Sequence, residues 1–312
     1  MSDPDPLDDA LEPDEAADAI YTMRIRGAAK IGRTAAAALG RLARDADGAD
    51  THAVLSETAR RLVKARPTAV TLRNAVNLTT QGLAEKDPQE LAENTAQRAR
   101  GFIRDSLQAG QEVAKRAVDK IPPGSVVLTH CHSSLAVACL VAAHKAHGDV
   151  RVFADETRPW WQGHISTRQL AEEGVPVSLQ VDSAARYVME TKGVDQVFVG
   201  ADAVMADGSL YNKIGTHQVA LAAKDLGIPV FVACETHKFS PYSLDGELPE
   251  VEQRDVSEVI GEPIPGVDVL NPVFDRTPGG LIERYITQEG DMEPASIKDW
   301  LSANHGDREG WI

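Results

Sequence analysis

The chain has 312 residues, 43% of them hydrophobic, which is ordinary for a globular protein with a sizeable buried core. Lys and Arg number 32 against 47 Asp and Glu, so the net charge is −15, and such a surface repels a nucleic-acid backbone. No apolar run approaches the roughly 20 residues that span a bilayer, and the acidic start lacks the apolar core of a signal peptide, so we expect no membrane partner.

Cysteine usage and charge suggest the environment. The chain has three cysteines, Cys131, Cys139 and Cys234, and this odd, low number favours free thiols in a reducing cytoplasm. The excess of carboxylates, with Arg outnumbering Lys, fits either an ordinary acidic protein or a halophilic one, in which dense carboxylates keep the surface hydrated at high salt.

The first part of the chain is expected to be helical. Residues 1–14 are acidic and are broken by Pro4 and Pro6, which predicts a mobile tail. Residues 15–121 are predicted to form an N-terminal helical domain, because apolar residues recur there at three- and four-residue spacing. The expected helices lie over about 15–46, with a break at Arg26-Gly27-Ala28, and over 52–65, 68–83 and 88–120.

Strands and helices alternate after Pro122-Pro123-Gly124. Residues 122–312 are therefore predicted to form a Rossmann-like domain with a parallel sheet, which makes the fold class α/β with a preceding helical domain. The expected strands are 126–128, 150–154, 177–181, 197–199 and 230–233, and the expected helices are 134–146, 166–173, 184–191 and 215–226. Beyond about residue 250 we expect irregular segments, short strands and a last helix near 294–303.

Each of the five predicted strands ends at a polar cluster. In an open parallel sheet, ligands bind in the crevice beyond the carboxyl ends of the strands, so these clusters are expected to converge on one pocket. A thiol, a carboxylate and several cations would meet there, as in an enzyme.

Cys131 is the strongest candidate for chemistry. It lies between a predicted strand and a helix that opens at Ser133 or Ser134, and a helix N-terminus lowers a thiol pKa by favouring the thiolate. The alternative is a small buried hydrophobe, which is the role expected of Cys139 and Cys234. A metal site in His130-Cys131-His132 is not expected, since adjacent strand residues point to opposite faces.

Two further features have both a catalytic and a plain structural interpretation. Asp202 follows an apolar strand and a Gly, and it is either a catalytic acid or a turn residue. The segment Asn212-Lys213-Ile214-Gly215-Thr216 opens a helix, so it is either an anion site with a Lys beside free amides or an ordinary capped helix. No GxGxxG, Walker or GxSxG motif is present, so no cofactor is expected.

The motifs, taken in order, resemble the family of initiation-factor-2B-like sugar-phosphate isomerases, over residues 20 to 290. They are Arg26-Gly27-Ala28, Arg66-Pro67-Thr68-Ala69, Thr129-His130-Cys131-His132-Ser133, Glu156-Thr157-Arg158-Pro159, Gln162-Gly163, Asp182-Ser183-Ala184-Ala185, Gly200-Ala201-Asp202, Asn212-Lys213-Ile214-Gly215-Thr216, Glu235-Thr236, Lys238-Phe239 and Asn271-Pro272-Val273-Phe274-Asp275. The His-Cys-His-Ser form is similar to that of archaeal members that convert α-D-ribose 1,5-bisphosphate to D-ribulose 1,5-bisphosphate in AMP and nucleoside degradation.

The resemblance implies a catalytic pair, Cys131 and Asp202, a sugar bisphosphate as substrate, a homo-oligomer (dimer or hexamer) and AMP as a candidate activator. The expected substrate-binding residues are Arg26, Gly27, Ala28, Arg66, Ser133, Arg158, Gln162, Asn212, Lys213 and Lys238. Two alternatives stay open: a methylthioribose-1-phosphate isomerase, and a non-catalytic regulatory protein of the initiation-factor-2B type.

Overall fold

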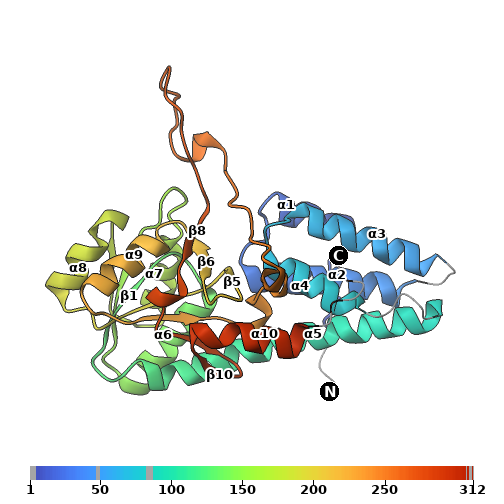
Figure 1. The fold of residues 1–312 in the computed structure, drawn as a ribbon, viewed down its shortest axis with the longest axis horizontal. Coiled ribbons are helices and arrows are strands. Elements are labelled where there is room, and N and C mark those ends of the chain that lie inside the picture. The colour runs from blue at the N-terminus through green and yellow to red at the C-terminus, as the bar shows by residue number, and fades with distance from the viewer. Residues whose placement is uncertain (1–4, 47–49, 82–86, 307, 309–310, 312) are drawn as a thin grey trace.

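The computed structural model describes residues 5–46, 50–81, 87–306, 308 and 311. A helical part and an α/β part lie side by side along the long axis of the molecule (Figure 1). This arrangement confirms the predicted fold class. Among the described helices, none combines the length and the apolar character that crossing a membrane requires.

The elements follow the order expected from the sequence. The helices are α1 (Pro13–Tyr21), α2 (Ala28–Arg44), α3 (Thr51–Ala65), α4 (Val70–Thr80), α5 (Pro88–Ala117), α6 (Ser134–His147), α7 (Gly163–Glu172), α8 (Ala185–Lys192), α9 (Thr216–Asp225) and α10 (Ile297–His305). The strands are β1 (Val126–Thr129), β2 (Arg151–Asp155), β3 (Val177–Gln180), β4 (Gln196–Val199), β5 (Ala203–Val204), β6 (Leu210–Lys213), β7 (Val230–Ala233), β8 (Phe274–Thr277), β9 (Arg284–Thr287) and β10 (Gly290–Met292).

The main sheet has seven strands in the order β10-β9-β7-β4-β1-β2-β3. All neighbours in it are parallel except β10, which pairs antiparallel with β9. The chain runs from β1 outward to β3, then returns to the other side of β1 as β4 and continues outward to β9. The strand order therefore reverses between β1 and β4, which is where open α/β sheets form their ligand crevice.

Alternation along the strands feeds two cores, one on each face of this sheet. Val127 and Phe198 pack against α5, α6 and α7 on one face. Leu128 and Val197 pack against α8, α9 and α10 on the other. Since successive strand residues point to opposite faces, the continuous apolar runs seen in the sequence are what a sheet covered on both sides requires.

The structure adds features that the sequence did not reveal. A second sheet of three antiparallel strands, in the order β5-β6-β8, joins residues near 204 to residues near 275. Between β7 and β8, residues 251–273 leave the body as an arm that returns on itself (Figure 1).

The predicted mobile tail over residues 1–14 is wrong for the residues described there. Leu7 is fully buried in the helical core, and the Asp5 carboxylate accepts hydrogen bonds of 2.6–3.0 Å from Arg100. An apolar residue seven places from the start, flanked by acids that pair with arginines, anchors the segment. Residues 1–4 lie outside the described part of the chain.

The division between the two cores falls within α5 rather than at residue 121 or 122. Leu91, Ala99 and Phe102 belong to the helical core, whereas Val113 and Ala117 pack with the sheet and α6. One helix of 30 residues therefore belongs to both parts of the molecule.

Candidate active site

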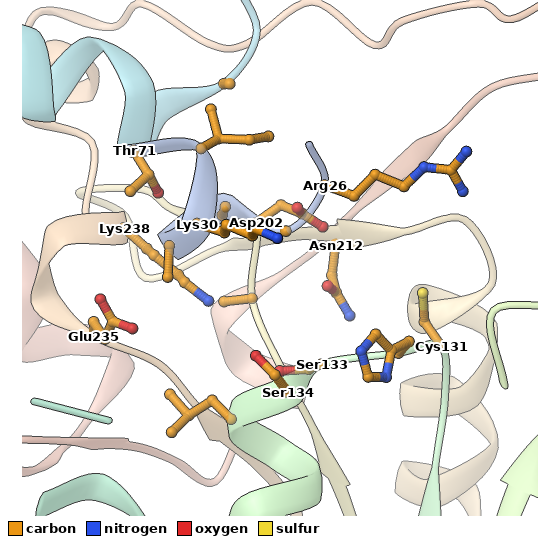
Figure 2. A pocket seen from close by; sticks show the side chains of 18 of the residues that line it. Arg26, Lys30, Thr71, Cys131, Ser133, Ser134, Asp202, Asn212, Glu235 and Lys238 are labelled. Atoms are coloured by element: carbon orange, nitrogen blue, oxygen red, sulfur yellow. The ribbon is translucent and has the colours of Figure 1, made fainter. Parts of the chain in front are cut away.

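A cavity of about 790 Å³ lies between the helical part and the carboxyl ends of the sheet strands (Figure 2). Its walls come from the starts of α2, α4, α7 and β8, the middle of α5, the end of β6, and the loops that follow β1, β4 and β7. Of the five polar clusters expected to converge, those after β1, β4 and β7 line this cavity, whereas those after β2 and β3 do not. The helical part forms the other side of the cavity.

Cys131 and Asp202 reach this cavity from the loops of two neighbouring strands, β1 and β4, at the reversal of strand order. Gly200 allows these loops to approach each other, since a Cβ at this position would lie 2.4 Å from the Ser133 hydroxyl oxygen. The thiol and the carboxylate are therefore placed around one space by the fold itself.

The Cys131 backbone is held in an uncommon conformation, with φ at 70°. Its amide donates to the Thr157 hydroxyl over 2.9 Å, and its carbonyl accepts from the Ser166 hydroxyl over 3.1 Å. The thiol lies 3.6 Å from the Gln162 side-chain oxygen. Strained backbone held by surrounding contacts is characteristic of functional sites.

The expected lowering of the Cys131 pKa is wrong. Burial raises the pKa of this thiol to about 12, and the nearby charge of Lys213 only partly opposes that effect. Ser133 is the N-cap of α6, as predicted, but the desolvation of a thiol that is 8% exposed outweighs the helix N-terminus. In this structure Cys131 therefore carries its proton at neutral pH and is placed to act as an acid.

Most of the predicted substrate-binding residues line the cavity. They are Arg26, Gly27, Ala28, Arg66, Ser133, Gln162, Asn212, Lys213 and Lys238. Arg158 does not line it. The Arg158 guanidinium stacks over the Trp161 ring at 4.7 Å and donates to the Val259 carbonyl, so the structure uses this side chain to hold the arm.

The first amides of α2 and α9, which lie near the cavity, are used differently. At α2 the capping residue is Gly27, with φ at 86° and no side chain to accept from the first amides, and Ala28, Ala29 and Lys30 all line the cavity. A helix N-terminus whose first amides have no capping side chain attracts anions.

At α9 the structure favours the capped-helix interpretation over the anion site, because a carboxylate of the chain already accepts from the amides there. Asp275 accepts hydrogen bonds from the amides of Gly215 (2.7 Å) and His217 (3.1 Å). A phosphate would have to displace this carboxylate to reach these amides.

Sequence reasoning missed several residues of the cavity wall, including Lys30, Arg33 and Glu235. Lys30 and Arg33 lie three positions apart in the first turns of α2, which places them on one helical face, so the pattern could have revealed them together. Burial alone would raise the pKa of Glu235, but neighbouring His237 and Lys238 lower it, and Ser106 donates to its carboxylate over 2.9 Å. Glu235 thus stays ionised at the floor of the cavity.

The cations of the cavity are poorly paired. Across the residues that the structure describes, Lys30, Lys213 and Lys238 form no ion pair with a carboxylate, although Lys238 is only 5% exposed. Arg66 lies 3.7 Å from Glu252, and its buried Nε has no hydrogen-bond partner among those residues. In a chain of net charge −15, three lysines without a carboxylate ion pair in one cavity indicate a site for a strongly anionic ligand.

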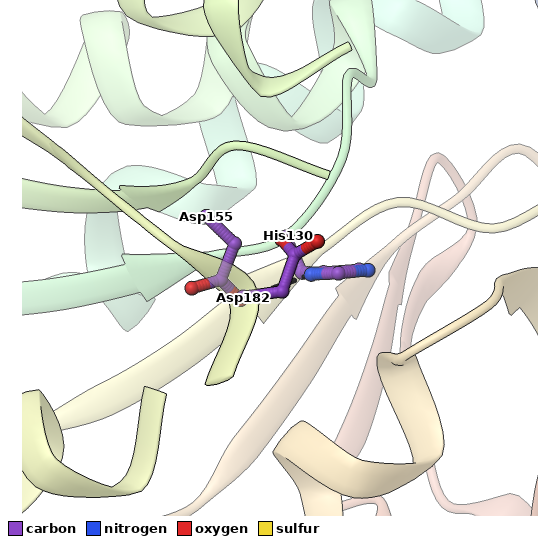
Figure 3. A group of neighbouring side chains, drawn as sticks. All are labelled: His130, Asp155 and Asp182. Atoms are coloured by element: carbon purple, nitrogen blue, oxygen red, sulfur yellow. Dashed lines mark hydrogen bonds and ion pairs between the residues drawn. The ribbon is translucent and has the colours of Figure 1, made fainter. Parts of the chain in front are cut away.

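The orientation of His130 and His132 does not favour a shared metal site. His130 faces Asp155, and His132 faces the Ser166 hydroxyl at 3.0 Å, so the two rings diverge. His130, Asp155 and Asp182 have possible ligand atoms within 4.8 Å of one another (Figure 3), but each of the three already hydrogen-bonds within the protein.

Comparison with known proteins agrees with the fold and the motifs. The "Ribose 1,5-bisphosphate isomerase" of Archaeoglobus fulgidus is 44% identical over 282 residues, covering 90% of this chain and 89% of that one. The "Methylthioribose-1-phosphate isomerase" of Heliobacterium modesticaldum is 36% identical and covers 90% and 87%. The solved structure of the translation initiation factor eIF-2B from Pyrococcus horikoshii OT3 superposes with a TM-score of 0.79 at 26% identity, covering 90% and 97%. With residues 24–294 matching its sequence pattern, the chain belongs to the initiation factor 2 subunit family.

Proposed function

We propose that the chain is an isomerase that converts α-D-ribose 1,5-bisphosphate to D-ribulose 1,5-bisphosphate. The observation that carries the proposal is the cavity between the two parts of the molecule. It combines a buried thiol, a carboxylate on the adjacent strand and several cations without carboxylate partners. The high identity to the A. fulgidus enzyme supports the same reaction.

The cation distribution fits a substrate with two phosphates. Arg26 and Lys30 lie on the helical wall (Figure 2), together with the free amides of α2. Lys213 also lines the cavity, at the end of β6. A bisphosphate needs an anion site at each end of a five-carbon sugar, whereas a methylthio sugar needs one anion site and one apolar pocket. We assign Arg66, Ser133, Gln162, Asn212 and Lys238 to substrate binding with these groups, and we no longer include Arg158.

The proposed roles of the pair follow from the reaction. The closed ring must open, which requires a proton at the ring oxygen, and a hydrogen must then pass from C2 to C1. Cys131 transfers protons at the C1–C2 end, and its protonated resting state suits it to begin as the donor. Asp202 moves protons among the sugar oxygens. Deuterium at C2 separates the two routes for that hydrogen: retention in the product indicates a direct shift, and loss to solvent indicates an enediol.

The substrate assignment is tested by comparing kcat/KM for ribose 1,5-bisphosphate, methylthioribose 1-phosphate and ribose 1-phosphate. We expect the bisphosphate to be preferred by at least about 100-fold, because a site built for charge leaves its cations unpaired with the other two sugars. A preference for methylthioribose 1-phosphate would instead assign the activity of a methylthioribose-1-phosphate isomerase. The H. modesticaldum relative and apolar wall residues such as Leu107 and Ile165 favour this second candidate. Absence of turnover with all three would favour a regulatory role.

Several properties stay predictions that accompany this function. The free thiols of Cys131, Cys139 and Cys234 support a cytoplasmic location. Exposed apolar residues on the arm, among them Ile264, Val267 and Leu270, support a homo-oligomer, which sedimentation would measure. Activation by AMP is tested by turnover at limiting substrate with and without the nucleotide, and adaptation to high salt by the melting experiment described below.

A further inference from the structure

The ring of His130 bonds to two different elements from a buried position. Its Nδ1 lies 2.9 Å from a carboxylate oxygen of Asp155, at the end of β2, and its Nε2 lies 2.9 Å from the Ile214 carbonyl, at the start of α9. The side chains of His130 and Asp155 are 1% and 0% exposed. Because a carbonyl can only accept, Nε2 must carry a hydrogen.

The His130 ring lies so close to the turn before α9 that position 215 must be a glycine. Gly215 follows Ile214 with φ at 102°, and a Cβ at this position would lie 2.9 Å from the His130 ring. The turn therefore rests against the ring both through its carbonyl and through the bare Cα of Gly215. The relative position of the β1 loop and the α9 turn is set by this side chain.

The two bonded residues are each next in sequence to a residue of the cavity. His130 precedes Cys131, and Ile214 follows Lys213, and both neighbours line the site. The ammonium of Lys213 is also the main charge that opposes the effect of burial on the Cys131 pKa. A displacement of the α9 turn would therefore change the electrostatic environment of the thiol.

Charged groups surround the ring on several sides. Asp155 lies on β2, Asp182 follows β3, and Asp275 caps α9 from β8. Burial alone would lower the pKa of His130, but the hydrogen bond and charge of Asp155 raise it. The second oxygen of Asp155 accepts from Gln180 over 2.7 Å, so the pair is fully hydrogen-bonded.

We propose that His130 is a positioning residue that links the Cys131 turn to the Lys213–Gly215 turn and so fixes Lys213 in the wall of the cavity that Cys131 also lines. The link is the donated bond from Nε2 to the Ile214 carbonyl, and Asp155 orients the ring that makes it. The inference rests on the proposed function only through the use of Cys131.

The test uses the rate at which iodoacetamide alkylates Cys131 at pH 9, followed on the Cys131 peptide by mass spectrometry. Below its pKa, a thiol reacts through its thiolate fraction, which falls tenfold for each unit that the pKa rises. Gln at position 130 places its amide nitrogen near the position of Nε2, whereas Asn places its own near that of Nδ1. His130→Gln can therefore keep the Ile214 bond, and His130→Asn cannot.

We expect Lys213→Met and His130→Asn each to slow alkylation by about tenfold, and His130→Gln to stay within about threefold of the wild type. The double variant Lys213→Met/His130→Asn should be no more than about twofold slower than Lys213→Met alone, because the second change acts through the same charge. An unchanged rate in His130→Asn, or fully additive effects in the double variant, would overturn the proposal.

Asp155→Asn keeps the proposal testable if His130→Asn fails to fold. A neutral His130 still donates from Nε2 to Ile214, so alkylation should remain within about threefold of the wild type. If alkylation of Asp155→Asn were as slow as that of Lys213→Met, the proposed role of the bond from His130 to the Ile214 carbonyl would be wrong. Since no sugar is used in the assay, its outcome is independent of which substrate the enzyme prefers.

Discussion

At the scale of single residues, the site combines a buried thiol with a half-buried carboxylate on the adjacent strand loop. Cys131 is held by hydrogen bonds to both its amide and its carbonyl, while Asp202 is anchored through its amide, which donates to the Tyr211 carbonyl over 3.1 Å. Neither side chain fills the core of the sheet. Replacing either should therefore affect chemistry more than folding.

We predict that Cys131→Ser and Asp202→Asn each fold normally and lose about 10²- to 10⁴-fold in kcat, which is the usual contribution of a positioned acid or base. Steady-state turnover of the bisphosphate gives the loss, and circular dichroism with a thermal melt verifies folding. Cys139→Ser serves as the matched control, since this buried thiol lies in α6 away from the cavity wall. Near-native turnover in Cys131→Ser would remove the assignment.

The raised pKa of Cys131 predicts how its reactivity depends on pH. Because burial raises the pKa to about 12, the thiol is protonated throughout the neutral range, and its alkylation should accelerate about tenfold per pH unit without levelling off below pH 10. The measurement is the rate of Cys131 modification between pH 7 and pH 10 in the absence of substrate. An alkylation rate that levels off near pH 7 or 8 would show that the helix N-terminus lowers the Cys131 pKa more than burial raises it.

At the scale of elements, α2 and α9 differ in how their first amides are used. Those of α9 are capped by Asp275, whereas those of α2 open into the cavity with Lys30 beside them. Helix α2 is therefore the better candidate for direct binding of a phosphate.

Lys30→Gln should raise KM for ribose 1,5-bisphosphate by about 10- to 100-fold, the equivalent of one charge-assisted hydrogen bond. The effect should shrink with added salt, because exposed charges are screened. Lys64→Gln on α3 is the control, as this exposed lysine does not line the cavity. Equal KM values for Lys30→Gln and Lys64→Gln would show that Lys30 does not bind a phosphate of the substrate.

Local patterns determined which elements could be predicted. The apolar runs of β1, β2, β4 and β7 and the periodic helices are continuous in sequence, and the structure confirms them within a few residues. The sheet β5-β6-β8 was missed because its strands are short and its pairing joins Tyr211 to Arg276, far along the chain.

The same limit applies to the candidate site. Placing Cys131 and Asp202 in one crevice required only the rule for parallel strands, and the cavity includes both. The capping of α9 depends on Asp275, 60 residues from Gly215, and the diversion of Arg158 depends on Val259, 101 residues away. Contacts of that range are decided by packing, which a single sequence does not display.

At the scale of the whole molecule, the net charge of −15 is the dominant electrostatic feature. Repulsion among surface carboxylates destabilises the compact state, and ions screen it. We therefore predict a higher melting temperature in molar KCl than in dilute buffer. Sucrose at matched osmolality is the control for effects that do not depend on charge. Equal melting temperatures in the two salt conditions would argue against adaptation to high salt.

Helix α5 gives the molecule a mechanical property. It spans roughly 45 Å, with its first half in the helical core, its last turns in the core beneath the sheet, and Ser106 and Gly110 in the cavity wall between them. A hinge between the two parts would have to bend this continuous rod. The cavity is therefore expected to admit substrate by movements of loops and side chains. The two cores should melt as one cooperative unit, so a ligand that stabilises the cavity protects both together.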